Sequence, residues 1–578
     1  MSENKPVIEQ KPITQVAAGE MPAWEVDTLP EPPSMRWGIK DVVGPGFMMV
    51  GAAIGGGEWL MGPKVATDFG GSIMWLALMS IGLQLIYNVE VIRYANFCGE
   101  SMFVGFFRLF PGPRVWAWFY LFVDFFGLWP YLAASAAVPI AAVFLGHVPE
   151  QPMTSYRTTQ QIVAATGLDT KLVEEIRTAP KSFAKIENSA KNIRAYPEPF
   201  LEQMRQDKNI VRYVSFGVFL LAFVPLLIGG KIYNALVKIM TVKIFIVLAY
   251  LGFVALAYVK WDTWFEIFAG FFFYSTTADG HYQFQFIRGG FSELLNGKVD
   301  IALLGAFAAI AGQGGMNNAQ FASYARDRGM GMGGKVGAIG SIVGGRDLAL
   351  AHTGKCFLIS AESMQRWRGW MRLVWRDQVA VWMVGCILGM AIPALVSLEF
   401  LRGMQLQDNE VAAKMADALR DKTHFGFMWY IPLIVGFFVL APTQVTATEG
   451  LVRRWTEVSW SASKRLAGLH GSQVKYVYFT LLVAYLLWGL FVLLYLGDRQ
   501  MLIVKASGVI MNAALGLTAF HTLAVNCILL PREVRPNWFM RIGMVLCGLF
   551  FIGIAVVTTP KTVRELKEQL MPAAVQAK

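Results

Sequence analysis

Eleven stretches of the sequence are long and apolar enough to cross a lipid bilayer, and they constrain the fold more than any other feature. A helix needs about 20 mainly apolar residues to span the hydrocarbon core. The stretches lie near residues 44–69, 72–93, 115–145, 213–229, 233–259, 299–324, 378–400, 426–448, 475–496, 500–530 and 538–558. Charged residues make up only 16% of the chain, against about 25% in soluble domains. We therefore expect an all-α polytopic protein with about 11 transmembrane helices, surrounded by the lipid bilayer.

The net charge of +11 arises from Lys and Arg in the loops between the apolar stretches. Such loop charges set membrane topology, and no nucleic-acid motif accompanies them, so no nucleic-acid partner is expected. In the short loops, Lys and Arg are more frequent on the side of the N-terminus, which predicts a cytoplasmic N-terminus. We expect a multi-pass protein of a bacterial-type inner (plasma) membrane. The five cysteines show neither metal-ligand nor disulfide spacing.

Two of the apolar stretches are interrupted by clustered glycines. Residues 52–58 read AAIGGGE in the first stretch, and residues 308–318 read AAIAGQGGMNN in the sixth. They lie five spans apart, and an odd offset reverses the direction across the membrane, so a five-helix unit repeated once would be inverted. Glycines also serve close helix packing, but at a spacing of about four. Because a carboxylate and amides are costly at this depth, we predict two broken helices that line a solute site.

The interruptions also suggest how the chain is divided. Residues 1–35 are polar and are expected to form a disordered cytoplasmic N-terminus. The expected parts that follow are a first repeat of five helices (36–259) with an extracytoplasmic insertion (147–211), a second repeat (260–530) with a cytoplasmic loop (325–377), and an eleventh helix with a C-terminal tail (531–578).

Several motifs resemble the Nramp family of divalent-metal transporters. Residues 44–47 (GPGF) precede the first interruption as in the first helix of that family, and residues 66–70 (ATDFG) and Trp75 fit its pattern. Residues 441–448 (APTQVTAT) are similar to the hydroxyl-rich eighth helix of the family, and Met316 falls on its sixth-helix methionine. The resemblance covers about residues 36–530. It implies the LeuT-type fold, in which ten helices form two inverted repeats of five.

The departures from this family fall on its metal ligands. The metal-binding Asp of the first helix falls on Gly55, and the Asn falls on Glu58. One His of the sixth helix falls on Asn318, and a second falls on Ser323. Only Met316 remains of the metal ligands, and a lone thioether suits hard or borderline divalent ions poorly. The chain therefore resembles a divergent member that lacks the metal-binding Asp and His motifs.

The predicted solute site combines backbone groups of both interruptions with amides and one carboxylate. Consecutive glycines remove side-chain volume, so we expect a cavity larger than an ion requires. Amides donate and accept hydrogen bonds and suit neutral or zwitterionic molecules, whereas the carboxylate of Glu58 favours a cation or caps the following helix. The predicted ligands of the solute are Gly55, Gly56, Gly57, Glu58, Gln313, Gly315, Met316, Asn317 and Asn318.

Two coupling ions, Na⁺ and H⁺, are compatible with the sequence, and no other cofactor is expected. The ligands of Na⁺ that the resemblance implies are the carbonyl of Gly55 and the hydroxyls of Thr443, Thr446 and Thr448. Threonines in membrane helices also bond their own backbone. The candidate proton carriers are Glu58, Glu90 and Asp124. In the tenth stretch, His521 and Asn512 either line the site or form helix-to-helix hydrogen bonds.

The leading interpretation is a secondary active transporter that moves a small polar organic solute, cationic, zwitterionic or neutral, by alternating access and symport. One alternative is a divalent-metal transporter that uses Glu58 and Met316 as ligands. An alternative of another class is a membrane sensor that keeps the fold without transport. An enzyme is not expected, because the sequence contains neither a nucleophile paired with a base nor a P-loop.

Overall fold

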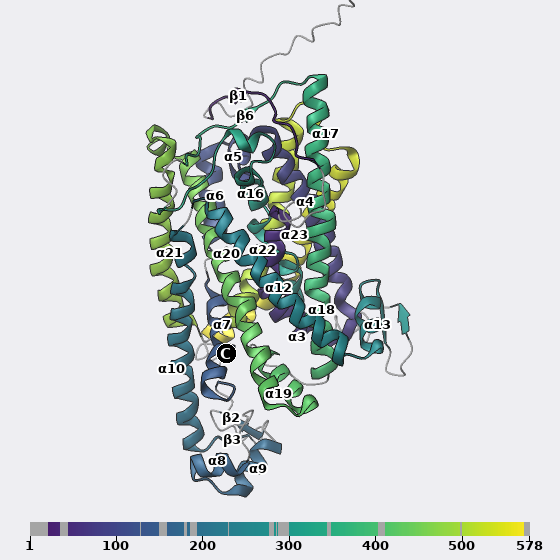
Figure 1. Cartoon of the computed structure of the whole chain (residues 1–578), viewed down its shortest axis with the longest axis vertical. Coiled ribbons are helices and arrows are strands. Elements are labelled where there is room, and N and C mark those ends of the chain that lie inside the picture. Colours follow the sequence, from purple (N-terminus) through teal and green to yellow (C-terminus); the bar gives the residue numbers. More distant parts are fainter. Residues whose placement is uncertain are drawn as a thin grey trace, which may run out of the picture.

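The computed structural model describes residues 21–34, 44–125, 127, 129–149, 159–178, 182–184, 193–228, 230–276, 282–284, 286, 300–343, 348–402, 411–497 and 500–570. These residues form an elongated helical bundle (Figure 1) with three two-stranded sheets. We call the end with β1 (Glu25–Val26) and the start of α17 (Ala361–Trp375) the N-terminal face. The other end, with α8 (Thr159–Thr166) and α9 (Thr170–Thr178), is the opposite face.

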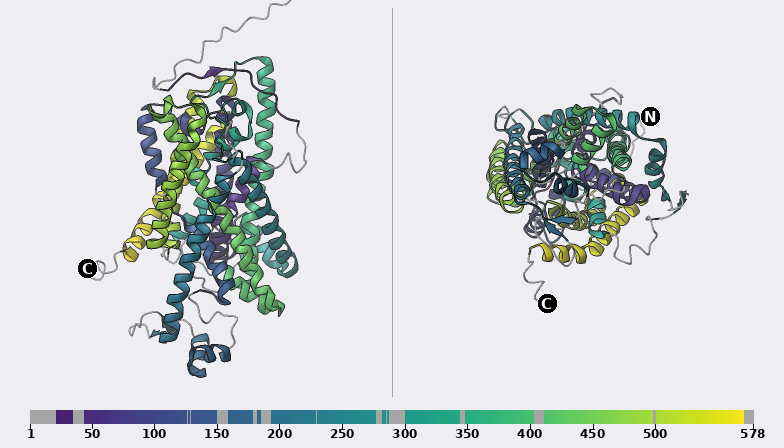
Figure 2. Two further views of the ribbon diagram at one scale, coloured as in Figure 1. Left: turned by 60° about the vertical axis from the view of Figure 1, so that its left-hand side comes forward. Right: turned by 90° about the horizontal axis from the view of Figure 1, so that it is seen from below.

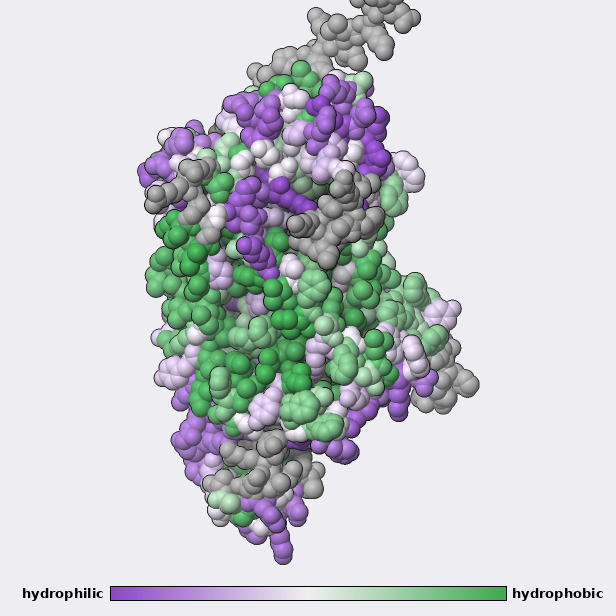
Figure 3. Space-filling view, viewed as in Figure 1, coloured by the Kyte–Doolittle hydropathy of each residue, from purple (hydrophilic) through white to green (hydrophobic). Residues whose placement is uncertain are grey.

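Eight helices in the described ranges are long and apolar enough to cross a membrane. They are Gly62–Cys98 (α3 Gly62–Phe69 and α4 Met74–Cys98), Glu198–Leu227 (α10 Glu198–Leu221 and α11 Val224–Leu227), Ile232–Tyr258 (α12), Ala361–Leu401 (α17 and α18 Val384–Leu401), Gly426–Ala462 (mostly α20, Tyr430–Ala462), Gly471–Leu496 (mostly α21, Val474–Leu496), Leu502–Ile528 (in α22, Gln500–Ile528) and Trp538–Lys567 (in α23, Trp538–Leu570). Apolar residues cover the middle of the molecule and polar residues both ends (Figure 3). The expected class, an all-α polytopic membrane protein, is confirmed.

The other three expected spans are interrupted helices. The first span consists of α2 (Pro45–Ala53), a π-helical turn (Gly56–Met61) and α3, which is also the start of the helix Gly62–Cys98. The sixth span consists of α15 (Ile301–Ile310), a 3₁₀ turn (Gly315–Asn317) and α16 (Gln320–Arg328). The third span consists of α6 (Pro113–Phe125) and α7 (Tyr131–Leu145). Both predicted interruptions are present. The expectation of one helix over residues 115–145 is wrong, because Pro130, with ψ 44°, precedes α7 and has no N–H to continue α6.

The interrupted helices converge on the centre of the bundle. Seen from below, the helices form a rounded bundle with α23, in yellow, at its edge (Figure 2). There α20 packs against α7 and α12, and α22 packs against α15 and α23. The short helices are α5 (Met102–Phe107), α13 (Trp261–Gly270) and α19 (Val411–Thr423), and the remaining strands are β2 (Phe183–Ala184), β3 (Arg194–Ala195), β4 (Tyr274–Thr276), β5 (Tyr282–Phe284) and β6 (Lys355–Cys356).

The N-terminal segment 21–34 is ordered against the N-terminal face. β1 pairs in parallel with β6, and Trp24 packs edge-on against Phe97 of α4 at 5.7 Å between ring centroids. Arg108 donates to the backbone oxygen of Pro22 at 2.8 Å. The expectation of disorder throughout residues 1–35 is therefore wrong for 21–34, because an aromatic anchor and a strand pairing offset the entropy of ordering; residues 1–20 and 35 lie outside the described ranges.

Two expected loops are partly helical. α10 begins at Glu198 and runs without interruption toward the fourth span, so the last part of the insertion 147–211 is an extension of a membrane helix. The helix of the seventh span likewise begins at Ala361, inside the expected loop 325–377. α8, α9, β2 and the start of α10 share a small apolar core at the opposite face, formed by Ile162, Val173, Ile176, Phe183 and Phe200.

Candidate functional site

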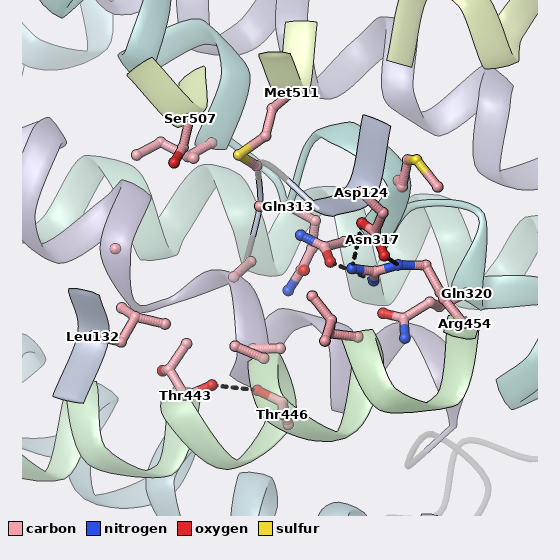
Figure 4. Close-up of a pocket in the computed structure, with 18 of the residues that line it drawn as sticks. Asp124, Leu132, Gln313, Asn317, Gln320, Thr443, Thr446, Arg454, Ser507 and Met511 are labelled. Atoms are coloured by element: carbon pink, nitrogen blue, oxygen red, sulfur yellow. Dashed lines mark hydrogen bonds and ion pairs between the residues drawn. The ribbon is translucent and has the colours of Figure 1, made fainter. Parts of the chain in front are cut away.

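A cavity of about 120 Å³ lies where the three interrupted helices meet α20 and α22 (Figure 4). It is lined by Met49, Ala52, Ala53 and Gly56 of the first helix, Asp124, Gly127, Trp129, Tyr131 and Leu132 of the third, Ile310, Gln313, Met316, Asn317, Gln320 and Tyr324 of the sixth, Thr443, Thr446, Ala447, Leu451 and Arg454 of α20, and Tyr485, Ser507 and Met511 of α21 and α22. The lining is mixed, with amides and hydroxyls among apolar groups. Of the predicted solute ligands, Gly56, Gln313, Met316 and Asn317 line the cavity.

The interruption of the sixth helix is held open by backbone conformations that favour glycine. Gly314 and Gly315 have φ of 63° and 62°, and Gln313 between them and α15 has φ of 124°. The amide of Gln313 donates to the backbone oxygen of Met49 at 3.1 Å. This bond joins the sixth-helix break to the first helix, so the two halves of the chain meet at the cavity.

A glutamine of α4 satisfies the freed backbone groups of this break. Gln84 Nε2 donates to the oxygen of Ala311 at 2.7 Å, and Gln84 Oε1 accepts from the N–H of Gly314 at 3.0 Å. Ser80 Oγ donates to the oxygen of Ala308 at 2.7 Å. Unpaired backbone groups are costly inside a membrane, so these two side chains stabilise the broken geometry. Sequence reasoning missed them, although polar residues in an apolar span are a signal.

Three predicted solute ligands lie outside the cavity lining. Asn318 is fully buried and its Nδ2 donates to Gln84 Oε1 at 3.0 Å and to Asn88 Oδ1 at 2.8 Å, so its side chain faces α4. Gly315 packs on Met511, and Gly55 packs on Thr443. Gly57 and Glu58 lie in the π-helical turn, and their predicted contacts with a solute fall outside what the structure describes.

The glycines of the first break serve close packing and do not enlarge the cavity. A Cβ atom on Gly55 would lie 2.6 Å from Thr443 Cγ2, and one on Gly56 would lie 2.8 Å from Tyr131 Oη. Neighbouring side chains therefore fill the volume that the missing side chains leave. The expectation that these glycines create extra space is wrong for both positions, because α20 and the start of α7 approach the break closely.

A buried ion pair forms one wall of the cavity. Arg454 of α20 donates to both carboxylate oxygens of Asp124 at 3.0 and 2.9 Å, and the side chains are each only 6% exposed. Arg454 also donates to Asn317 Oδ1 at 2.7 Å, and Trp455 Nε1 donates to Asp124 at 3.1 Å. Asp124 was predicted as a proton carrier, and the structure places both of its oxygens against one bidentate guanidinium. The pair contributes no net charge to the cavity.

The threonines predicted to bind Na⁺ have other partners. Lys243 of α12 is 1% exposed, and its ammonium donates to Thr443 Oγ1 and, at 2.7 Å, to the oxygen of Gly51 in the first helix. Thr446 donates to the backbone oxygen of Thr443 at 2.9 Å. Thr448 accepts from Gln444 at 3.1 Å and is not in the cavity wall. A resident ammonium thus already joins the first helix to α20 where the cation was expected.

Glu90 and the two polar candidates of the tenth span have partners away from the cavity. Arg93 donates to both oxygens of Glu90 at 3.0 and 3.1 Å, so Glu90, a predicted proton carrier, is part of an ion pair. His521 lies 2.7 Å from Tyr120 Oη, and Asn512 donates to the oxygen of Gly305 at 2.9 Å. Both residues of the tenth span therefore form helix-to-helix hydrogen bonds. Among the described residues, no group of three or more His, Cys, Asp or Glu side chains is placed to hold a metal ion.

Comparison with known proteins shows the fold. The chain is similar to the crystal structure of the Eremococcus coleocola manganese transporter in complex with an aromatic bis-isothiourea substituted compound, with 10% identity, a TM-score of 0.55, and 92% of this chain and 89% of that chain covered. It is also similar to MhsT in complex with L-phenylalanine, with 14% identity, a TM-score of 0.41, and 92% and 100% of the chains covered. No family model and no curated protein matches the sequence. The first likeness confirms the expected LeuT-type fold.

Proposed function

We propose that the protein is a secondary active transporter, a divergent relative of the Nramp transporters, that moves a small polar organic solute by alternating access. The observation that carries the proposal is the cavity at the meeting point of three interrupted helices. Broken helices at the middle of a membrane bundle supply polar backbone groups to a solute. Relative motion of the two halves of the chain, joined here by Gln313 and Met49, would expose the cavity to one side at a time.

The chemistry of the lining supports an organic solute over a divalent metal ion. Its hydrogen-bonding groups are amides and hydroxyls, such as Gln313, Gln320 and Ser507, and its ion pair is neutral. Hard divalent ions require several oxygen ligands that carry charge, whereas amides and hydroxyls suit neutral or zwitterionic molecules. Met316 lines the cavity and is the surviving feature of the metal-transport alternative. Binding of a cationic solute would depend on the carboxylate of Glu58, whose side chain is not described.

The topology completes the proposal. The excess of Lys and Arg in the loops on the side of the N-terminus supports a cytoplasmic N-terminal face. The protein would then be a multi-pass protein of a bacterial-type inner membrane, with α8 and α9 on the outer side.

A thermal-shift screen of the purified protein tests the solute class. We expect members of a panel of small amino acids, betaines and amides to raise the melting temperature, and expect Mn²⁺, Co²⁺ and Mg²⁺ to leave it unchanged. Na⁺ replacing K⁺ should also have no effect, because the ammonium of Lys243 already bonds Thr443. Gln313→Ala should abolish the response to an organic ligand, and Gln160→Ala, at an exposed position of α8, is the matched control. Stabilisation by a divalent metal that Met316→Ala removes would reject the organic solute.

A further inference from the structure

A buried ionic cluster separates the cavity from the N-terminal face. It joins α16 to α20 and consists of Arg326, Asp327, Glu449, Arg453 and Glu457, which we call the α16–α20 cluster. Their side chains are at most 2% exposed. Arg453 lies 2.6 Å from Asp327 and 2.5 Å from Glu449, and Arg326 lies 2.9 Å from Asp327 and 2.7 Å from Glu457.

The charges of this cluster do not balance. It contains three carboxyl groups and only two guanidinium groups, so full ionisation would leave one uncompensated negative charge without water. An uncompensated buried charge costs several kcal/mol, and a carboxyl group avoids this cost by keeping its proton. By contrast, the carboxylates of Asp124 and Glu100 are each matched by one arginine.

The other ionisable groups around the cluster do not supply the missing positive charge. Arg454 is committed to Asp124, and the ammonium of Lys231, at the start of α12, donates to the backbone oxygen of Asp327 at 3.2 Å and is part-exposed. The remaining neighbours are tyrosines, an already matched pair, one imidazole and one exposed arginine. They are Tyr324 of α16, Tyr233 of α12, Tyr478 of α21, the pair of Glu100 and Arg108 near α5, His352, whose Nε2 lies 2.9 Å from the backbone oxygen of Leu469, and Arg328, which is exposed at the end of α16 near Asp377.

We propose that the α16–α20 cluster is a proton-binding site and that Glu449 holds the proton. Asp327 accepts from a guanidinium on each of its oxygens. Glu449 and Glu457 each accept from a guanidinium on one oxygen and from a hydroxyl on the other, which is that of Tyr324 at 2.7 Å for Glu449 and that of Ser323 at 2.7 Å for Glu457. Glu457 also lines a small pocket, whereas the side chain of Glu449 is 0% exposed, so Glu449 is the carboxyl group for which a charge is most costly. A tyrosine hydroxyl accepts a hydrogen bond as readily as it donates one, so it partners a protonated carboxyl equally well.

Tyr324 connects this proton to the solute cavity. Tyr324 lines the cavity, and its hydroxyl forms a hydrogen bond with Glu449. A change at the solute site therefore reaches the cluster through this one side chain. Opening of the cavity toward the N-terminal face would move α16 away from α20 and admit water. The proton then passes from the Glu449 carboxyl to water, and the admitted water solvates the carboxylate that remains. This coupling role rests on the proposed transport function, whereas the proton site does not.

Infrared spectroscopy of the full-length protein in nanodiscs tests the site. In the wild-type minus Glu449→Gln difference spectrum at pH 7, we expect a carbonyl band of a protonated carboxylic acid that shifts to lower frequency in D₂O. The spectra of the Glu457→Gln and Glu100→Gln variants should still contain this band. Glutamine mimics a protonated glutamate, so Glu449→Gln should also keep the wild-type melting temperature, whereas Asp327→Asn should lower it by several degrees.

Two outcomes would overturn the inference. One is the absence of the band from the wild-type difference spectrum, with Glu449→Gln as destabilising as Asp327→Asn, which would make Glu449 an ordinary carboxylate. The other is loss of the band in Glu457→Gln, which would place the proton elsewhere. A band at Glu449 in a protein that transports no solute would leave the proton site intact and reject the proposed transport function instead.

Discussion

Replacing Arg454 by leucine is expected to abolish solute binding and to lower the free energy of unfolding by about 3–5 kcal/mol, the cost of leaving one member of a buried ion pair alone. In the wild type, this guanidinium binds both oxygens of Asp124 and also holds the amide oxygen of Asn317. Without it, the carboxylate of Asp124 keeps only the hydrogen bond from Trp455 Nε1 among the contacts described above. The change in unfolding free energy is measured by reversible denaturation in mixed micelles.

The double variant Arg454→Leu with Asp124→Leu provides the control for this prediction. Removing both charges leaves no uncompensated ion, and well-packed apolar replacements of buried pairs are often neutral or stabilising. We therefore expect the double variant to recover most of the lost stability while binding no ligand. If the single variant were as stable as the wild type, the carboxylate of Asp124 would not depend on Arg454, and the two residues would not form a buried ion pair in the cavity wall.

Replacing Gly314 by alanine is expected to destroy the sixth-helix break. A Cβ atom at this position would lie 1.5 Å from the backbone oxygen of Ala309, and the φ of 63° is unfavourable for an L side chain. Backbone strain of about 1–3 kcal/mol combines with overpacking of about 1–3 kcal/mol, so we expect a loss of about 2–6 kcal/mol in the free energy of unfolding. A thermal melt and the yield of folded protein in detergent measure this loss.

Gly82→Ala is the matched control for this substitution. Gly82 lies in α4, close in sequence to Gln84, and apart from its chain neighbours and the backbone of its own helix no atom lies within 4 Å of a Cβ placed there. Alanine is favoured over glycine inside a helix by about 0.5–1 kcal/mol, so this variant should be slightly more stable than the wild type. Equal melting temperatures for Gly314→Ala and Gly82→Ala would show that the break does not need its left-handed glycine.

The sequence predicts those parts of the fold that depend on local composition. The apolar stretches locate the spans, and the clustered glycines near Gly55 and Gly314 locate two of the breaks, because hydrophobicity and backbone freedom are properties of neighbouring residues. The third break also had a local signal in Gly127 and Pro130. A proline inside an apolar span is common enough in membrane helices that it did not by itself predict an interruption.

The partners of the polar residues were not predictable in the same way. Asp124 and Arg454 are 330 positions apart in the sequence, and Lys243 meets Thr443 across 200 positions. Neither pairing leaves a periodic pattern, so the sequence singled out Asp124 as an ionisable residue in a membrane span but identified neither Arg454 as its partner nor Lys243 as the partner of Thr443. Asn318 illustrates the same limit, because one step around a helix turns an amide from the cavity toward α4.

The central claim, that the cavity is exposed to both sides in turn, is tested most directly by cysteine labelling. Ala447 lines the cavity on α20, and the only described cysteine that is not fully buried is Cys527, so Ala447→Cys is placed in a Cys527→Ser background. Ala137→Cys, at a fully buried position outside the cavity, is the control. A membrane-impermeant thiol reagent is applied to one side of sided vesicles at a time. We predict labelling of Ala447→Cys from both sides and none of Ala137→Cys; labelling from one side alone under every ion and pH gradient would contradict transport and favour a membrane sensor.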